Sequence, residues 1–225
     1  MRITHVIYDL DGTLLDTEPF YLHTTDAIFA RHGMRLPAEV RAMMMGRPNA
    51  VAIPLMLEHT GLPMTVEEFR RERDDALHAL FPGALPTAGA RELTDHLARH
   101  GIPQAVATSS SRESLTHKLV RHAAWFETFE TVVLAEDVEH GKPAPDIFLE
   151  AARRMDADPA ACLVFEDAPL GVDAALAAGM QVVAIPEAEH AERVAGAHAI
   201  IESLAAFDPA SWGLPPFALP GRNER

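Results

Sequence analysis

Apolar and β-branched residues dominate the stretch from Ile3 to Tyr8, and this run ends abruptly at Asp9, Asp11 and Gly12. A continuous apolar run of this length is typical of a strand buried on both faces of a parallel sheet. We therefore predict a buried strand whose carboxyl end carries two carboxylates. Gly12 permits a sharp turn that can bring both carboxylates to one ligand.

The pattern becomes helical after this strand. No strand pattern is found between Thr17 and Phe81, and Thr65 with Glu68 has the spacing of a capping box at a helix start. Residues 17–83 therefore predict a helical domain inserted into the chain, with Pro82 and Gly83 as the return hinge. The predicted helices cover about residues 17–32, 37–45, 49–59 and 65–80.

Strands and helices alternate in the remainder of the chain. This alternation predicts an α/β fold with an open, doubly wound, mostly parallel sheet, built from residues 1–16 and 84–225. The predicted strands cover about residues 104–108, 131–135, 163–166, 181–185 and 199–201. The predicted helices between them cover about residues 88–100, 112–121, 146–155 and 170–178.

Polar residues gather where the predicted strands end, and ligand sites of such sheets lie at the carboxyl ends of the strands. A carboxylate cluster, hydroxyl and amide donors, and one lysine are the groups that phosphoryl transfer requires, with magnesium held by the carboxylates. Each group alone could be only a turn or a helix cap. The residues at these strand ends are Asp9, Asp11, Thr108, Ser109, Lys142, Glu166 and Asp167.

A calcium loop also begins with Asp-x-Asp, but it requires a preceding helix and a glycine at its sixth position. Here a predicted strand precedes, and Gly12 is the fourth residue. The histidines form no HExxH pattern. His96 and His100 lie near the end of a predicted helix, where polar side chains are ordinary, so we do not expect them to bind a metal.

Composition and net charge limit the classes of molecule that this chain is expected to bind. The formal net charge is −14 and no cluster of Lys or Arg is present, so neither nucleic acid nor an acidic membrane surface is an expected partner. No apolar run approaches the roughly 18 residues of a membrane span. The start of the chain lacks a signal-peptide pattern, so a cytoplasmic location is expected, and Cys162 is the single cysteine, which excludes an internal disulfide. A monomer is also expected.

These motifs together resemble the haloacid dehalogenase superfamily. DLDGT at Asp9 to Thr13 is similar to its first motif, Thr108 to its second, Lys142 in GKPAPD to its third, and Glu166-Asp167 to its fourth. The resemblance implies an enzyme that hydrolyses a small phosphorylated metabolite with the help of Mg²⁺, and a helical insertion that acts as a mobile cap.

The resemblance also implies individual roles. Asp9 would attack phosphorus and form an aspartyl-phosphate, and Asp11 would protonate the leaving alcohol and then activate water. Phosphate oxygens would be held by Thr108, the Ser109 amide and Lys142. The metal set would be Asp9, the Asp11 backbone carbonyl, Asp167 and, in a supporting role, Glu166.

Within the superfamily, segments such as HGKPAPDIFL and CLVFEDAP resemble the pseudouridine-5′-phosphatases, which makes pseudouridine 5′-phosphate or a sugar phosphate a candidate substrate. The insertion is less similar, and Arg47 stands where a lysine is expected. A mutase of the β-phosphoglucomutase kind remains an alternative, although Tyr21 occupies the place of its early cap histidine and His23 lies nearby. A non-catalytic regulator on the same fold would lack a motif residue, and none is missing.

Overall fold

The computed structural model describes residues 2–44 and 49–217. Its centre is a six-stranded sheet with the order β5-β4-β1-β6-β7-β8, and each neighbouring pair of strands is parallel. The predicted parallel sheet is therefore confirmed. The six strands are β1 (His5–Tyr8), β4 (Gln104–Ala107), β5 (Thr131–Val133), β6 (Cys162–Glu166), β7 (Gln181–Ala184) and β8 (Ala199–Ile200).

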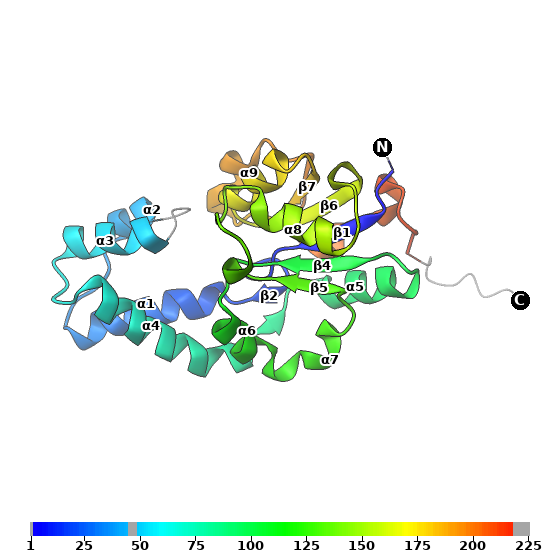
Figure 1. The fold of residues 1–225 in the computed structure, drawn as a ribbon. Helices are drawn as coiled ribbons and strands as arrows, with labels where there is room; N and C mark the ends of the chain where they lie inside the picture. The colour runs from blue at the N-terminus through cyan, green and yellow to red at the C-terminus, as the bar shows by residue number, and fades with distance from the viewer. Residues whose placement is uncertain (1, 45–48, 218–225) are drawn as a thin grey trace, which may run out of the picture. The chain divides into compact units, whose positions relative to one another are not determined.

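Helices cover both faces of this sheet (Figure 1). On one face Ile7 and Val164 pack in the same core cluster as Phe148 and Val172, which belong to α8 and α9. On the other face the Gln104 amide donates to the backbone oxygen of Thr94 in α5, at 3.0 Å. Side chains alternate between the faces of a strand, so the sheet is buried on both sides, which explains its apolar sequence. These helices are α5 (Ala90–Arg99), α7 (Ala123–Phe126), α8 (Asp146–Arg154) and α9 (Pro169–Ala177).

The segment between β1 and α5 is largely helical, as predicted. Its core contains Ile28, Phe29, Ile53, Met56 and Phe69, all nearly inaccessible to solvent. At the start of its last helix the Glu68 backbone amide donates to the Thr65 hydroxyl and the Thr65 amide donates to the Glu68 carboxylate, which confirms the predicted capping box. The helices are α1 (Glu18–Arg31), α2 (Ala38–Met44), α3 (Asn49–Thr60) and α4 (Val66–Leu80).

The structure divides into two units. Among the described residues, the α/β unit comprises residues 2–15, 86–112 and 122–217, and the helical unit comprises residues 16–44, 49–85 and 113–121. The sequence-based domain boundaries assigned residues 113–121 to the α/β part, because they follow a strand of the sheet. In the structure this segment, which includes most of α6 (Arg112–Lys118), groups with the helical unit.

Two short strands mark the points where the chain passes between the units: β2 (Leu15–Asp16) and β3 (Leu85–Pro86) pair in a two-stranded sheet. Neither was predicted, because two residues carry no periodic pattern. Among the described residues no helix is both long and apolar enough to cross a membrane.

Candidate active site

The carboxyl ends of three adjacent strands carry the predicted site residues. β1 lies between β4 and β6, and Tyr8 is in register with Val106 on one side and with Phe165 on the other. The next residues along these strands, Asp9 and Glu166, therefore lie at one edge of the sheet. Thr108 directly follows β4 at the same edge and is almost fully buried.

Lys142 joins the carboxylates that follow β1 and end β6, those of Asp9 and Glu166. Its ammonium donates to Asp9 Oδ1 at 2.5 Å and to Glu166 Oε1 at 2.6 Å, and also to the Ala107 backbone oxygen at 3.3 Å. The side chains of Lys142, Asp9 and Glu166 are 8%, 9% and 1% exposed, so this triad is screened very little by water. Residues distant in the sequence thus meet at one point, as the strand ends predicted.

Burial and charge set the protonation of the triad. Burial is the largest influence on Asp9 and raises its pKa; Lys142 opposes the shift, Glu166 and Asp11 add to it, and the resulting pKa is about 7. For Lys142, burial lowers the pKa, but Asp9 and Glu166 outweigh it and the net shift is upward. Lys142 is therefore firmly protonated. Three neighbouring carboxylates against one ammonium leave an excess of negative charge that a divalent cation would offset.

The donor set at this edge fits a divalent metal ion. Single carboxylate oxygens of Asp9, Glu166 and Asp167 lie within 4.8 Å of one another. Hard oxygen ligands of this kind suit Mg²⁺. Gly12 has a φ of +80°, and a Cβ there would lie 2.3 Å from Asp167 Oδ2, so a glycine is required to leave that carboxylate its place.

Both carboxylate oxygens of Glu166 accept hydrogen bonds. Its Oε1 accepts from Lys142, and its Oε2 accepts from the Ala168 backbone amide at 2.8 Å. A Cβ on Gly171 would lie 1.6 Å from Glu166 Oε1, so the buried carboxylate is also fixed by the first turn of α9. These bonds suit a residue that orients the lysine and the metal ligands more than one that supplies a free ligand oxygen.

Asp11 has a hydrogen-bond partner that the sequence analysis did not identify. The Ser110 hydroxyl donates to Asp11 Oδ2 at 2.8 Å, and the Ser110 backbone amide donates to the Thr108 hydroxyl at 3.0 Å. The predicted phosphate-binding residue Ser109 lies between Thr108 and Ser110 in the sequence and is exposed. The loop after β4 thus reaches the Asp11 carboxylate. The sequence has three successive serines here, and it does not indicate which of them bonds Asp11. The remaining predicted residue, Arg47, lies outside the described residues.

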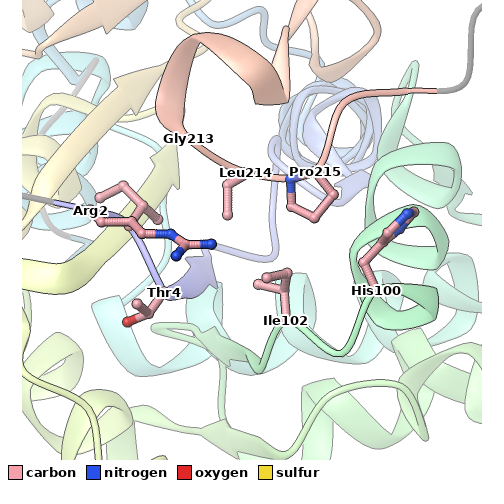
Figure 2. Close-up of a pocket in the computed structure, with 8 residues that line it drawn as sticks. Arg2, Thr4, His100, Ile102, Gly213, Leu214 and Pro215 are labelled. Carbon is pink, nitrogen blue, oxygen red and sulfur yellow. The ribbon is translucent and has the colours of Figure 1, made fainter.

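A separate pocket of about 330 Å³ lies at the amino ends of β1 and β4 (Figure 2). Because the predicted residues follow the carboxyl ends of the same strands, this pocket is not the candidate active site. No carboxylate is among the residues that line it. They are residues 2–4, His100, Ile102 and residues 213–215.

The model of the haloacid dehalogenase-like hydrolases matches residues 6–185. This chain therefore belongs to the haloacid dehalogenase-like hydrolase family, and the matched part includes every residue of the strand-end site. The family resemblance predicted from the motifs is confirmed. The family is hydrolytic, so the prediction of an enzyme is confirmed as well.

Two proteins with names of their own and one solved structure are also similar to this chain. A protein of Arabidopsis thaliana named (DL)-glycerol-3-phosphatase 1, mitochondrial, is 41% identical over 223 residues, which cover 96% of this chain and 75% of that protein. A protein of Drosophila melanogaster named "Probable pseudouridine-5′-phosphatase" is 39% identical over 222 residues, 96% of each chain. The crystal structure of CbbY from Rhodobacter sphaeroides in complex with phosphate is similar with a TM-score of 0.77 and 26% identity, over 91% of this chain and 96% of that one.

Proposed function

We propose that this chain is a magnesium-dependent phosphomonoester hydrolase that acts on a small phosphorylated metabolite through an aspartyl-phosphate. The observation that carries the proposal is the buried Asp9 carboxylate, bonded to the Lys142 ammonium at 2.5 Å beside Glu166 and Asp167. An anionic nucleophile, a fixed cation and a set of metal ligands are the requirements of phosphoryl transfer to a carboxylate.

In this proposal each residue has one task. Asp9 attacks phosphorus, and the alcohol leaves with a proton from Asp11; Asp11 then takes a proton from the water that hydrolyses the aspartyl-phosphate. Lys142, the Thr108 hydroxyl and the Ser109 amide hold the phosphoryl oxygens. A Mg²⁺ ion on Asp9, the Asp11 backbone carbonyl and Asp167 would offset the charge of phosphate and carboxylate.

The hydrogen bond from Ser110 to Asp11 supports the role given to Asp11. A general acid must be held where it can reach the leaving oxygen, and the Ser110 hydroxyl fixes the position of the Asp11 carboxylate. We expect Ser110→Ala to lower kcat and to leave KM nearly unchanged, because the substrate still binds but the acid is less well oriented.

We further propose that residues 17–83 form a cap that closes over the strand-end site and excludes water from the first step. The insertion of this helical segment directly after the first motif supports the idea. Arg47 lies between two of its helices in the sequence and is proposed to contact the leaving group. Arg47→Ala should then change the ranking of substrates by kcat/KM while leaving a small aryl phosphate nearly unaffected.

The experiment that tests this function is a panel of phosphorylated metabolites assayed with Mg²⁺, with EDTA, and with Mg²⁺ restored. The panel includes pseudouridine 5′-phosphate, glycerol 3-phosphate, 2-deoxyglucose 6-phosphate and β-glucose 1-phosphate, and both phosphate release and isomerised product are followed. We expect phosphate release that stops with EDTA and returns with Mg²⁺. Isomerised sugar phosphate without phosphate release would identify a mutase instead, and full turnover in EDTA would contradict the metal requirement.

A further inference from the structure

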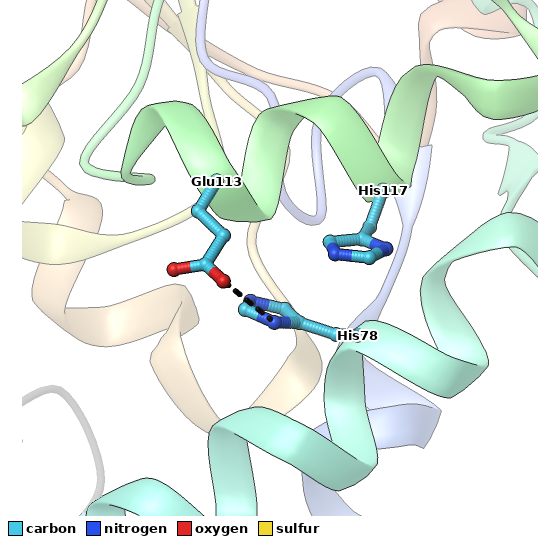
Figure 3. A group of neighbouring side chains, drawn as sticks. All are labelled: His78, Glu113 and His117. Atoms are coloured by element: carbon cyan, nitrogen blue, oxygen red, sulfur yellow. Dashed lines mark ion pairs between the residues drawn. The ribbon is translucent and has the colours of Figure 1, made fainter.

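A second group of side chains that could bind a metal ion lies in the helical unit and shares no residue with the strand-end site; Figure 3 shows its three side chains. His78 comes from α4, and Glu113 and His117 come from α6. Residues four apart on a helix lie on the same face, so the carboxylate and the imidazole of α6 point together toward His78. One ligand atom from each of the three lies within 4.8 Å of the others.

The distances are close to those of a metal site. His78 Nδ1 lies 3.8 Å from Glu113 Oε1, and the imidazole rings of His78 and His117 stack with 4.4 Å between centroids. Two ligands with bonds of about 2.0–2.1 Å to one tetrahedral ion are roughly 3.3 Å apart. The two imidazole rings are nearly parallel, with 13° between their planes, so binding of one ion requires the His117 ring to turn. The Glu113 side chain is 76% exposed and has room to move toward the same ion.

The hydrogen bond on the opposite side of the His78 ring supports this arrangement. His78 Nε2 lies 3.1 Å from the Ser114 hydroxyl. In the tautomer that donates from Nε2 to that oxygen, the lone pair of Nδ1 is on the side of the ring that faces the Glu113 carboxylate and is available to a cation. Metal-binding histidines commonly donate their second ring nitrogen to an oxygen in this way.

We propose that His78, Glu113 and His117 bind a transition-metal ion, with Zn²⁺ as the best match. Two imidazole nitrogens and one carboxylate oxygen form a donor set that suits Zn²⁺, Ni²⁺ or Cu²⁺, with a remaining position for water. Mg²⁺ requires oxygen ligands and does not compete there. This site is distinct from the strand-end carboxylates, and the proposal is independent of the function proposed for them.

The ion would cross-link two segments that are brought together only by folding. α4 lies in residues 16–85 and α6 begins the segment 113–121 of the same unit. An ion that binds the folded protein and not the separated ligands stabilises the folded state by an amount that rises with the logarithm of its concentration over its dissociation constant. Zn²⁺ should therefore raise the Tm of the full chain.

The test uses the whole 225-residue chain without a tag and with Mg²⁺ in excess, titrated with Zn²⁺ by calorimetry and with Co²⁺ by visible absorption. We expect one tight equivalent and a visible Co²⁺ band in wild type. His117→Ala and Glu113→Gln should weaken binding by about 10- to 100-fold or more and remove the rise in Tm. His59→Ala is the matched control, because His59 is an exposed histidine at the end of α3 in the same unit.

Circular dichroism establishes that each variant is folded before metal is added. Equal Zn²⁺ affinity in wild type, His117→Ala and Glu113→Gln would overturn the proposal, as would a wild-type protein that shows no Co²⁺ band. Loss of binding in His59→Ala to the same extent as in His117→Ala would also overturn it, because the ion would then be held elsewhere.

Discussion

Lys142 shows how single residues define this site. A lysine is seldom fully buried unless it is paired, and here two carboxylates and a backbone oxygen accept from its ammonium. The ammonium lies 5.0 Å from the centroid of the Phe148 ring, which adds a cation–π contact. Every donor of the side chain is thus satisfied while its charge faces the proposed nucleophile.

We predict that Lys142→Ala lowers kcat by on the order of a hundredfold, because removal of one electrostatic element from such a site costs about 3 kcal/mol of transition-state stabilisation. Lys142→Arg should restore little, since the planar guanidinium cannot replace a compact ammonium between Asp9 and Glu166. Steady-state kinetics measure both variants. Arg153→Ala, which alters an exposed cation on α8, is the control, and turnover by Lys142→Ala at the control's level would contradict the role of Lys142.

Gly171 gives a prediction about support of the same triad. Alanine in place of a helical glycine usually stabilises a protein, but here the new Cβ would lie 1.6 Å from Glu166 Oε1. We expect Gly171→Ala to lower the free energy of unfolding by about 1–3 kcal/mol and to reduce kcat, because Glu166 must move.

Denaturant unfolding and turnover assays measure the two effects. Gly83→Ala is the matched control, because its Cβ would meet nothing nearer than a Phe20 ring carbon at 3.8 Å. Unchanged stability and turnover in Gly171→Ala would show that Glu166 is not fixed by this contact.

The sequence identified most of the strand-end residues because their positions follow from topology. Asp9, Thr108 and Glu166 each stand where an apolar run ends, and parallel strands bring such ends to one edge. Ser110 was missed, because its partner Asp11 lies far from it in the sequence and any of three successive serines could have made the bond. The hydrogen bonds of Lys142 could not be predicted from the sequence either, since a lysine in a loop can point in many directions.

At the scale of elements, α4 depends on its N-terminal cap. The Thr65 hydroxyl accepts from the Glu68 amide at 3.2 Å and satisfies one of the otherwise unbonded amides of the first turn. We predict that Thr65→Ala lowers the free energy of unfolding by about 1 kcal/mol and Tm by roughly 2–4 °C, whereas Thr65→Ser changes both very little. Thermal unfolding of the two variants provides the test; equal losses in both would assign the effect to the Thr65 methyl group instead of its hydroxyl.

Most elements of the α/β unit were predicted, including the short strands β5 and β8. β1, β4, β6 and β7 were found from apolar runs, with ends displaced by one or two residues. β2, β3 and α7 escaped prediction because a strand of two residues spans one period and a helix of four residues barely exceeds one turn, so neither shows a repeating pattern. Residues 112–121 were predicted as one helix, but α6 ends at Lys118 and a 3₁₀ turn follows, a tightening common at helix ends.

At the scale of the whole molecule, the sequence showed a helical insertion but not the full membership of each unit. Residues 113–121 follow a sheet strand directly, and only contacts formed in three dimensions group them with residues 16–85. The cluster of His78, Glu113 and His117 depends on that grouping. No motif spacing could have indicated it, because its members come from segments separated by α5 and β4.

The central claim is that Asp9 becomes phosphorylated during turnover, and direct trapping of that species is the most direct test. The enzyme is mixed with a good substrate and Mg²⁺, quenched in acid within the steady state and reduced with borohydride, which converts an aspartyl-phosphate to homoserine. Mass spectrometry of the peptide that contains residues 5–16 locates the change. We predict homoserine at position 9, absent when substrate is omitted; a turning-over enzyme with no conversion at Asp9, or with conversion at Asp11 instead, would contradict the account.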